Sequence, residues 1–241
     1  MNLDIQTLIR VELNHLRSLR YSKQRIREWF ELYHLTMMDH LQEISLYVPC
    51  GDIVLEIGCG GGYLSYLMKF QGYEMIAGDI LDTDTPDGSF WIFSRKMKKR
   101  PAFIRFDGKE LSFKDNYFNA VVANAVLEHV GQGEEKFLRE ISRVLSPAGY
   151  LFIYELPRLW SYEYLGRKLG LRTGHERFYS EIYMYELLRR TGFRVLHVER
   201  YWFLPRSLSK LMRGRVFHYF RKWLKPFQPF ASFLKIICTK I

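Results

Sequence analysis

The sequence predicts an α/β fold in which a doubly wound, mainly parallel sheet carries helices on both faces. Three observations predict it. Short apolar runs alternate with helical patterns from about residue 52 onward, the runs are apolar at their centres, and a glycine cluster follows the first run. This alternation is typical of βαβ units, whose parallel strands are buried on both faces. With 241 residues, the chain is long enough for one sizeable domain and an extension.

The first part of the chain, residues 1–48, predicts an N-terminal helical extension. Apolar side chains recur there at intervals of three to five residues, which is the spacing of one helix face. The stretch "VPCGD" at 48–52 ends this pattern, and the strand patterns begin directly after it. We therefore expect the main domain to cover residues 49–241.

The main domain begins with a regular alternation of strands and helices. In chain order, the sequence predicts strand 53–58, helix 61–70, strand 73–79, helix 89–99, strand 102–107, strand 118–126, helix 134–145 and strand 150–156. The turn "SPAG" separates the last two of these elements. Parallel strands joined by helices should cross over with right-handed connections.

The rest of the domain is less regular. It predicts a helix that stops at Gly192, a strand over 194–203, an amphipathic helix over 206–225 and a last strand over 231–240. Charge is also concentrated here, because residues 156–241 carry 18 Lys and Arg against 5 Asp and Glu, a net charge of +13. Such a region favours an anionic partner: a phosphate-bearing substrate, a nucleic acid or an anionic membrane surface.

The expected location is cytoplasmic. The three cysteines are widely separated and form neither a metal-binding spacing nor an even disulfide set. The sequence shows no apolar run of about 18 residues, and its first residues lack the succession of a signal peptide. Aromatic and basic residues over 200–230 suit peripheral contact with a membrane, although a helix that only covers the sheet would show the same pattern.

A glycine-rich loop follows the first strand, in the stretch "LEIGCGGG". Gly58, Gly60 and Gly62 let the backbone turn sharply and lie against a ligand, because glycine has no Cβ and adopts positive φ. Glu56 precedes the loop and suits a cationic or hydrogen-bonding group. Asp79 ends the second strand and Asp107 the third, so three acids meet at the carboxyl edge of the predicted sheet. An acid about twenty residues after such a loop is placed to accept ribose hydroxyls.

These motifs resemble those of class I S-adenosylmethionine-dependent methyltransferases. "VLEIGCGGG" is similar to the first motif of that family, E/D-x-G-x-G-x-G, and "GDI" to the acidic end of its second strand. "FDGKELSFKDNYFNAVVANAVLEHV" and "LREISRVLSPAGYLFIYE" resemble the segments that follow. The resemblance covers about residues 50–156. It implies a Rossmann-like sheet of seven strands in the order 3-2-1-4-5-7-6, with the last strand antiparallel.

The resemblance also implies S-adenosyl-L-methionine as cofactor. The residues that it assigns to the cofactor site are Glu56, Gly58, Cys59, Gly60, Gly62, Asp79, Ile80, Asp107, Gly108, Asn124 and Ala125. Glu56 would lie near the methionyl part, Asp79 on the ribose and Asp107 on the adenine edge. A dehydrogenase is disfavoured, because its loop is usually G-x-G-x-x-G.

Two histidines are the candidates for a base that removes a proton from the methyl acceptor. His129 follows the fourth strand in "LEH", and His175 lies in "RTGHERFYS", within the acceptor-lid and basic region over 156–230. Both could instead cap or brace local structure. In quinone-pathway O-methyltransferases a similar E-x-x-E-H stretch binds a metal, but Ala125 stands at its first position. We therefore predict no metal.

The leading hypothesis is a methyltransferase that acts on a small or lipid-linked acceptor, at oxygen. Two alternatives stay open: an RNA methyltransferase, and a cofactor-binding partner protein without turnover. Nucleic acid is less favoured, because the chain reads "ANAVLEH" where one class of nucleic-acid methyltransferases has N/D-P-P-Y/F. The sequence leaves the acceptor and the oligomeric state open.

Overall fold

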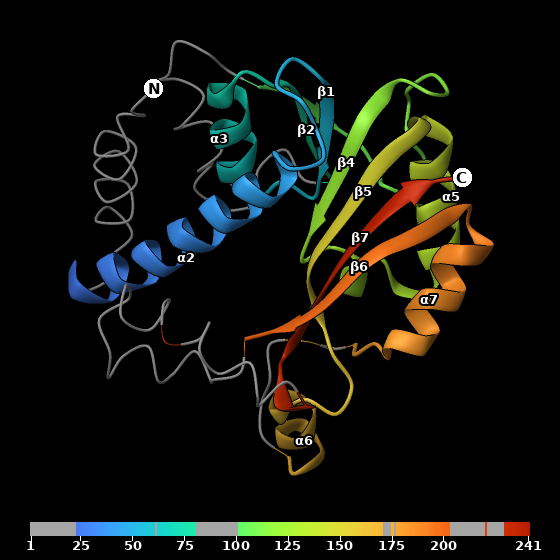
Figure 1. The fold of residues 1–241 in the computed structure, drawn as a ribbon. Coiled ribbons are helices and arrows are strands. Elements are labelled where there is room, and N and C mark those ends of the chain that lie inside the picture. Colours follow the sequence, from blue (N-terminus) through green and yellow to red (C-terminus); the bar gives the residue numbers. More distant parts are fainter. Residues whose placement is uncertain are drawn as a thin grey trace.

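The computed structural model describes residues 23–60, 62–80, 101–170, 175, 177–202, 220 and 229–241 (Figure 1). For residues 23–32 it describes the backbone alone. The helices predicted over 89–99 and 206–225 lie outside the described residues or almost wholly so, as do the first 22 residues of the helical extension.

The sheet has seven strands in the order β3-β2-β1-β4-β5-β7-β6. β1, β2, β3, β4 and β5 pair in parallel, whereas β7 runs antiparallel to both β5 and β6. This confirms the predicted fold class and strand order. The strands are β1 (Ile53–Ile57), β2 (Glu74–Asp79), β3 (Ala102–Arg105), β4 (Phe118–Asn124), β5 (Leu145–Pro157), β6 (Phe193–Tyr201) and β7 (Phe233–Lys240).

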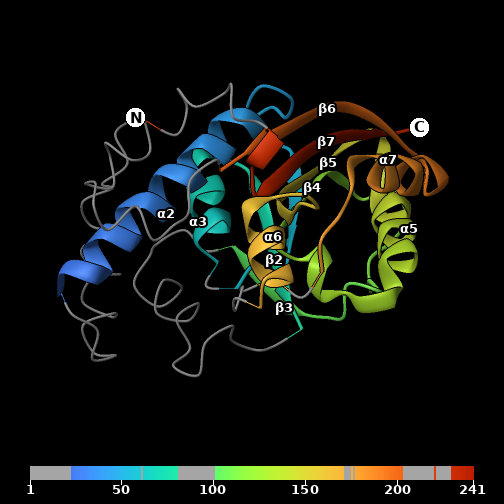
Figure 2. The same ribbon diagram turned by 90° about the horizontal axis from the view of Figure 1, so that it is seen from below.

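Helices cover both faces of this sheet. α2 and α3 lie on one face, and α5 and α7 lie on the other (Figures 1 and 2). Two 3-10 turns, η1 and η2, connect β4 to α5, and the short helix α6 follows β5. The bounds are α2 (Lys23–Ile44), α3 (Tyr63–Gln71), η1 (Leu127–His129), η2 (Gly131–Gly133), α5 (Glu134–Val144), α6 (Tyr162–Lys168) and α7 (Glu181–Arg190). Among the described residues, no helix is both long and apolar enough to cross a bilayer.

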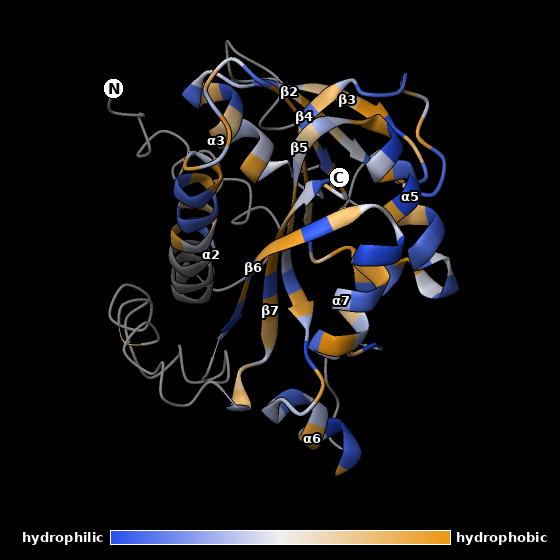
Figure 3. Ribbon diagram, turned by 45° about the vertical axis from the view of Figure 1, so that its right-hand side comes forward, coloured by the Kyte–Doolittle hydropathy of each residue, from blue (hydrophilic) through white to orange (hydrophobic). Residues whose placement is uncertain are grey.

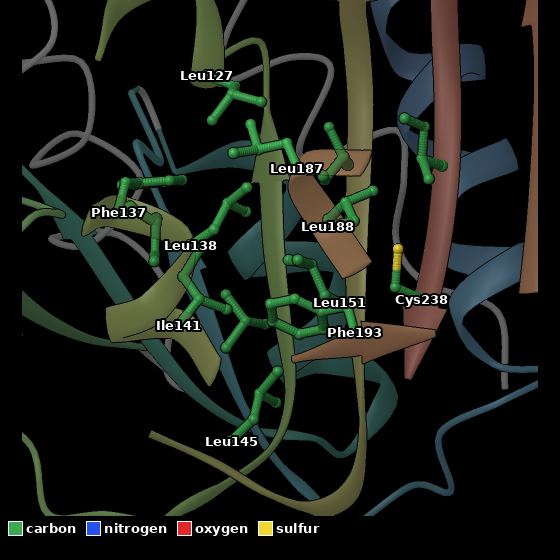
Figure 4. Close-up of a cluster of buried hydrophobic side chains, with 14 of the residues drawn as sticks. Leu127, Phe137, Leu138, Ile141, Leu145, Leu151, Leu187, Leu188, Phe193 and Cys238 are labelled. Atoms are coloured by element: carbon green, nitrogen blue, oxygen red, sulfur yellow. The ribbon is translucent and has the colours of Figure 1, made fainter. Parts of the chain in front are cut away.

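Each face of the sheet has its own hydrophobic cluster. On one face, the apolar sides of α5 and α7 meet the strands, and Leu138, Ile141 and Leu188 are fully buried there (Figure 4). Figure 3 shows hydrophobic and hydrophilic residues alternating around these two helices, as expected for helices with one buried side. The second cluster packs α2 and α3 against β1, β4 and β5. Burial on both faces explains why the centres of β1, β4 and β5 are apolar, whereas the edge strand β6 is largely exposed.

The described part of the helical extension packs against the main sheet. Met37, Leu41 and Ile44 lie on one side of α2 and are buried in the same cluster as α3. Glu43, also on α2, forms an ion pair with Lys235 of β7, with 2.7 Å between Glu43 Oε1 and Lys235 Nζ. α2 is therefore fixed to the sheet by apolar burial and by a charged contact.

One predicted boundary is wrong. The sequence predicts a turn over 146–149 between helix and strand, but β5 already begins at Leu145, which pairs with Phe118. The register shifts after this pair, and Ala148 has a positive φ of 59°. Ser146 Oγ donates to the Phe118 carbonyl oxygen at 2.9 Å. The turn residues thus form an irregular first stretch of the strand, because side-chain and backbone bonds to β4 hold them in the sheet.

Candidate active site

The glycine loop after β1 depends on left-handed backbone conformations. Gly58, Gly60 and Gly62 have φ values of 67°, 49° and 70°, which side chains with a Cβ seldom adopt. A Cβ on Gly58 would lie 2.4 Å from a methyl carbon of Val126. Gly62 has a different position from the other two, since it precedes the first residue of α3 and its N–H donates to the Cys59 carbonyl at 2.7 Å.

A cavity of about 470 Å³ lies at the carboxyl ends of the parallel strands, within the usual size of small-molecule sites. Ten of the eleven residues predicted to bind a cofactor line it, and Gly62 is the exception. The ten are Glu56, Gly58, Cys59, Gly60, Asp79, Ile80, Asp107, Gly108, Asn124 and Ala125. His129 also lines the cavity, whereas His175 is absent from its described lining.

Glu56 is a buried acid in the cavity wall. It is 3% exposed and accepts a hydrogen bond from Ser65 Oγ of α3. Burial raises the pKa of Glu56 to about 7, although the Ser65 hydrogen bond acts in the opposite direction. A positive charge in the cavity would therefore decide whether this carboxyl group is ionised near neutral pH.

Asp79 connects the end of β2 to the glycine loop. Its Oδ2 accepts a hydrogen bond from the Gly60 N–H at 3.0 Å. Asp107 lies at the rim of the cavity, where its Oδ1 accepts from the Lys109 N–H at 3.0 Å. Ile80, beside Asp79, is 57% exposed and offers an apolar surface. The parallel sheet thus brings the acids predicted from the sequence to one edge.

The backbone bends directly after β4 and within β5, and we name the residues that line the cavity there, Asn124, Ala125 and Glu155, its floor. Ala125 and Glu155 have positive φ values of 54° and 51°, and both line the cavity. The Ala125 N–H donates to the Tyr154 carbonyl at 3.0 Å, which fixes one turn on the other strand. Asn124 Oδ1 is buried and has no hydrogen-bond partner among the described residues. Strained backbone and an unsatisfied polar atom at one place are features of a ligand site.

Three further side chains form a cluster beside this floor, which we name the His175 cluster: Glu128, Glu163 and His175. His175 Nδ1 lies 3.7 Å from Glu128 Oε1, and His175 Nε2 lies 3.6 Å from Glu163 Oε2. The Glu128 side chain is 1% exposed, and among the described residues neither of its oxygens has a hydrogen-bond partner. Burial raises its pKa to about 7, and the charge of Glu155 acts in the same direction.

The two candidate histidines both approach Glu128 Oε1, but they differ in burial. His129 Nε2 is 3.9 Å from Glu128 Oε1, and its side chain is 68% exposed in the cavity wall. His175 is only 19% exposed and its ring packs edge-on against Phe233, with 5.3 Å between ring centroids. The more buried histidine, His175, therefore has a carboxylate facing each of its two ring nitrogens.

Glu163 and Tyr33 are among the residues of this region that the sequence does not single out. Glu163 belongs to α6, which begins after Ser161, whose Oγ accepts the Tyr164 N–H at 3.1 Å. Tyr33 reaches the cavity wall from α2. Neither carries a motif signal, because each meets the site only through the packing of a distant helix.

One group among the described residues has spacing that could hold a metal: Glu43, His197 and Glu199. Lys235 Nζ lies 2.7 Å from Glu43 Oε1 and 2.5 Å from Glu199 Oε2. The Lys235 ammonium thus already pairs with both carboxylates, so we interpret these three residues as part of a structural ion-pair network. It does not adjoin the cavity.

The residues of the cavity fit S-adenosylmethionine. The loop at Gly58 and Gly60 presents backbone without side chains, and buried Glu56 offers a carboxylate to the cationic methionyl end. Asp79 has the position of a ribose acceptor after a glycine loop. Asn124 offers an unsatisfied oxygen at the floor. The acids therefore match the charged methionyl end and the ribose hydroxyls of this molecule, and the glycines allow the backbone to approach it closely.

Cofactor affinity is expected to increase about eight-fold between pH 6 and pH 7.5. The physical reason is the raised pKa of Glu56, about 7, since only its ionised form pairs with the cationic methionyl end. Binding then lowers this pKa and releases a proton. Titration calorimetry in two buffers of different ionisation enthalpy measures both effects. The isosteric Glu56→Gln variant should bind with the same affinity across this range, and a pH slope like that of the wild type would contradict the assignment.

Comparison with known proteins places the chain in a family. Residues 21–198 match the family model described as "Methyltransferase domain". The chain is 34% identical over 137 residues to the fatty-acid O-methyltransferase of Mycolicibacterium smegmatis, covering 56% of this chain and 46% of that protein. It is 28% identical over 118 residues to the sterol 24-C-methyltransferase erg6 of Schizosaccharomyces pombe, covering 48% of this chain and 31% of that protein. The chain thus spans less than half the length of these two relatives.

Solved structures share the fold. An S-adenosylmethionine-dependent methyltransferase of Methanosarcina mazei has a TM-score of 0.61 at 20% identity, covering 82% of this chain and 96% of that one. The 1,6-didemethyltoxoflavin N1-methyltransferase of Burkholderia thailandensis, solved with S-adenosylhomocysteine, has a TM-score of 0.60 at 17% identity, covering 100% of this chain and 91% of that one. The strand order, the acid-flanked glycine loop and the family match agree: the chain has the fold of solved S-adenosylmethionine-dependent methyltransferases and belongs to the methyltransferase domain family.

Proposed function

We propose that the chain transfers the methyl group of S-adenosylmethionine to an oxygen atom of a small or lipid-linked acceptor. The observation that carries the proposal is the His175 cluster beside the floor of the cofactor cavity. A hydroxyl or carboxylic acid must lose its proton as the new bond forms, so an oxygen acceptor needs a proton-accepting group at this place. The relatives named as fatty-acid and sterol methyltransferases support an acceptor with a large hydrocarbon part.

In this proposal His175 and Glu128 handle the acceptor's proton, and the cofactor provides the methyl group. When bound, the cofactor supplies a methyl group on a positively charged sulfur. The methyl group would pass from that sulfur to the acceptor oxygen, with the carbon–sulfur electron pair left on sulfur. The acceptor's proton would pass to the His175 ring, whose Nδ1 faces Glu128 and whose Nε2 faces Glu163. Glu128, on the Nδ1 side of the ring, stabilises the charged imidazole. In-line alignment of acceptor and methyl group contributes much of the remaining catalysis.

The surroundings of His175 favour an apolar acceptor. Phe233 lies edge-on to the histidine ring, and Tyr201 packs against Phe233 with 6.0 Å between ring centroids. The Tyr201 hydroxyl oxygen accepts a hydrogen bond from the Glu155 N–H of β5 at 2.5 Å. An aromatic wall with its polar atoms already bonded suits the hydrocarbon part of a ligand.

Incubation with labelled cofactor tests the proposal. Cell extract is treated with the purified chain and separated into lipid, RNA and soluble pools. Label should enter the lipid or soluble pool, and purified fatty acids and lipid alcohols should then distinguish a methyl ester from a methyl ether by alkaline hydrolysis. Label confined to RNA would contradict the proposal. Cofactor binding without any transfer would instead support a partner protein without turnover.

RNA is the second candidate, because residues 156–241 carry a net charge of +13. Phosphate contacts make RNA binding fall steeply with salt. If RNA were the acceptor, its binding should weaken by orders of magnitude between 50 and 200 mM salt, as expected for several phosphate contacts. Binding that is absent or insensitive to salt would remove this candidate.

A further inference from the structure

The short helix α6 exposes a cluster of large apolar side chains. Leu165 and Leu169 lie one helical turn apart and are 40% and 81% exposed, and Trp160, just before the helix, is 66% exposed. Trp160 packs on Tyr164 with 5.6 Å between ring centroids. Scattered apolar residues on a surface are ordinary, but a group on one protruding element indicates an interaction site.

Two basic side chains border these apolar ones. Arg167 and Lys168 are exposed in the last turn of α6, over the rings of Phe178 and Tyr164 at 5.9 and 5.7 Å. With Leu159 they line a second, open cavity of about 480 Å³. The one acid of α6, Glu163, is 18% exposed and faces His175, so it does not neutralise the basic side chains. We name Trp160, Leu165, Arg167, Lys168 and Leu169 the α6 surface.

The α6 surface lies next to the candidate active site. In Figure 1, α6 stands below the sheet, past the end of β5, where that strand's carboxyl end meets the cavity side of the molecule. Arg167 Nη1 donates to the His175 carbonyl oxygen at 2.5 Å, and Glu163 of the same helix contacts the His175 ring. Whatever binds α6 is therefore held beside the His175 cluster.

Apolar and basic groups in this arrangement match an anionic bilayer surface. Tryptophan and leucine side chains are stabilised by burial at the boundary between lipid headgroups and acyl chains. Arg and Lys extend their charged ends to the lipid phosphates. The stretch around α6 is itself positive, since residues 156–199 carry 8 Lys and Arg against 5 Asp and Glu, so its charge is complementary to such a surface. An apolar protein partner would not need the two exposed cations.

We propose that the α6 surface docks on an anionic lipid membrane, with Trp160, Leu165 and Leu169 among the headgroups and Arg167 and Lys168 on lipid phosphates. Docking would turn the side of the molecule that carries His175 toward the bilayer. It does not depend on methyl transfer, because the groups that would contact lipid are separate from the cofactor cavity. The surface is also distinct from residues 200–230, whose basic side chains were singled out from the sequence.

Flotation of the full chain with vesicles tests the proposal. Vesicles of phosphatidylcholine alone are compared with vesicles that contain 30% phosphatidylglycerol, at low and high salt. The chain should float with the anionic vesicles at low salt. Lys168→Gln should weaken binding about five-fold, the loss expected for one surface cation, and Leu169→Ser about ten-fold through lost apolar burial. Leu46→Ser is the matched control, because Leu46 is 77% exposed and lies between α2 and β1, at the end of the parallel strands opposite to α6.

The outcomes separate docking from folding and from catalysis. Calorimetric affinity for S-adenosylmethionine should be the same in all variants, which shows that they fold. Wild-type protein that fails to float, or α6 variants that float as the wild type does, would overturn the proposal even if the enzyme is active. Equal losses in Leu46→Ser would also overturn it. RNA binding that the α6 variants weaken, without vesicle binding, would reassign the surface to nucleic acid.

Discussion

Replacing His175 with glutamine is expected to lower the rate of methyl transfer by about 10²- to 10⁴-fold, the usual contribution of a proton-transfer group. The reason is that His175 lies between Glu128 and Glu163 beside the cavity floor, and in the proposed mechanism its ring takes the proton of the acceptor. Affinity for S-adenosylmethionine should stay within about two-fold, because His175 is absent from the described lining of the cofactor cavity. Single-turnover kinetics with an acceptor that the wild type methylates measures the rate, and calorimetry measures the cofactor affinity.

His197→Gln is the matched control, since His197 lies on β6 beside Glu199 and away from the cavity. It should keep the wild-type rate. His129→Gln distinguishes the two candidate histidines: if His129 were the proton acceptor, its variant would lose the rate and His175→Gln would keep it. A structural role for His175 would instead lower stability and cofactor affinity together with the rate.

Glu128→Gln separates the role of Glu128 in catalysis from its effect on stability. The rate should fall less than for His175→Gln, and the pH profile of the rate should shift. Because the folded-state pKa of Glu128 is raised to about 7, the folded protein holds this proton more tightly than the unfolded chain does. The free energy of unfolding therefore decreases as pH rises from about 4.5 to 7. The variant should escape this loss, of up to about 3 kcal/mol, and thermal unfolding at pH 5 and pH 8 measures it.

The second large effect is expected from Asp79→Ala, which should weaken binding of S-adenosylmethionine about 10²-fold or more. Asp79 accepts the Gly60 N–H at 3.0 Å and lies in the cavity wall. The substitution removes the loop's contact and the acceptor expected for the ribose, and a hydrogen bond to a charged group contributes about 1.5–3 kcal/mol. Titration calorimetry with S-adenosylhomocysteine and S-adenosylmethionine measures the loss.

Asp52→Ala provides the control for this experiment. Asp52 is also an aspartate beside the sheet, but it precedes β1 at the opposite end from the cavity. Its variant should bind the cofactor as the wild type does. Unchanged affinity in Asp79→Ala would show that the ribose is held elsewhere, and the assigned orientation of the cofactor would be wrong.

Most of the fold followed from patterns that are local in the sequence. Alternating strand and helix patterns predicted a parallel sheet, and the motif resemblance supplied its order, including the antiparallel β7. The start of β5 was the error, because "SPAG" reads as a turn while Leu145 pairs with Phe118 in the sheet. Pairing with a neighbouring strand is a tertiary interaction that outweighs local turn preference.

The cofactor side of the site was also readable, since a parallel sheet brings the ends of its strands to one edge. Glu56, Asp79 and Asp107 could therefore be placed together from their positions after three strands. The glycine motif likewise indicated a backbone that turns and approaches a ligand. Gly62 was assigned to the cofactor site through the motif resemblance. In the structure it directly precedes the first residue of α3 and is absent from the described lining of the cavity.

The sequence by itself determined the layered sheet, the acid-flanked glycine loop and the basic character of residues 156–241, because each is a matter of local period, spacing or composition. Only the tertiary structure decided which groups lie together beside the cavity. Glu128 and His175 are 47 positions apart, and Glu163 joins them through the packing of α6. The burial that raises the pKa of Glu128 and the positive φ of Ala125 are likewise set by neighbours distant in the chain. Local patterns fix the elements, but the chemistry of this site depends on contacts that exist only after the elements have packed.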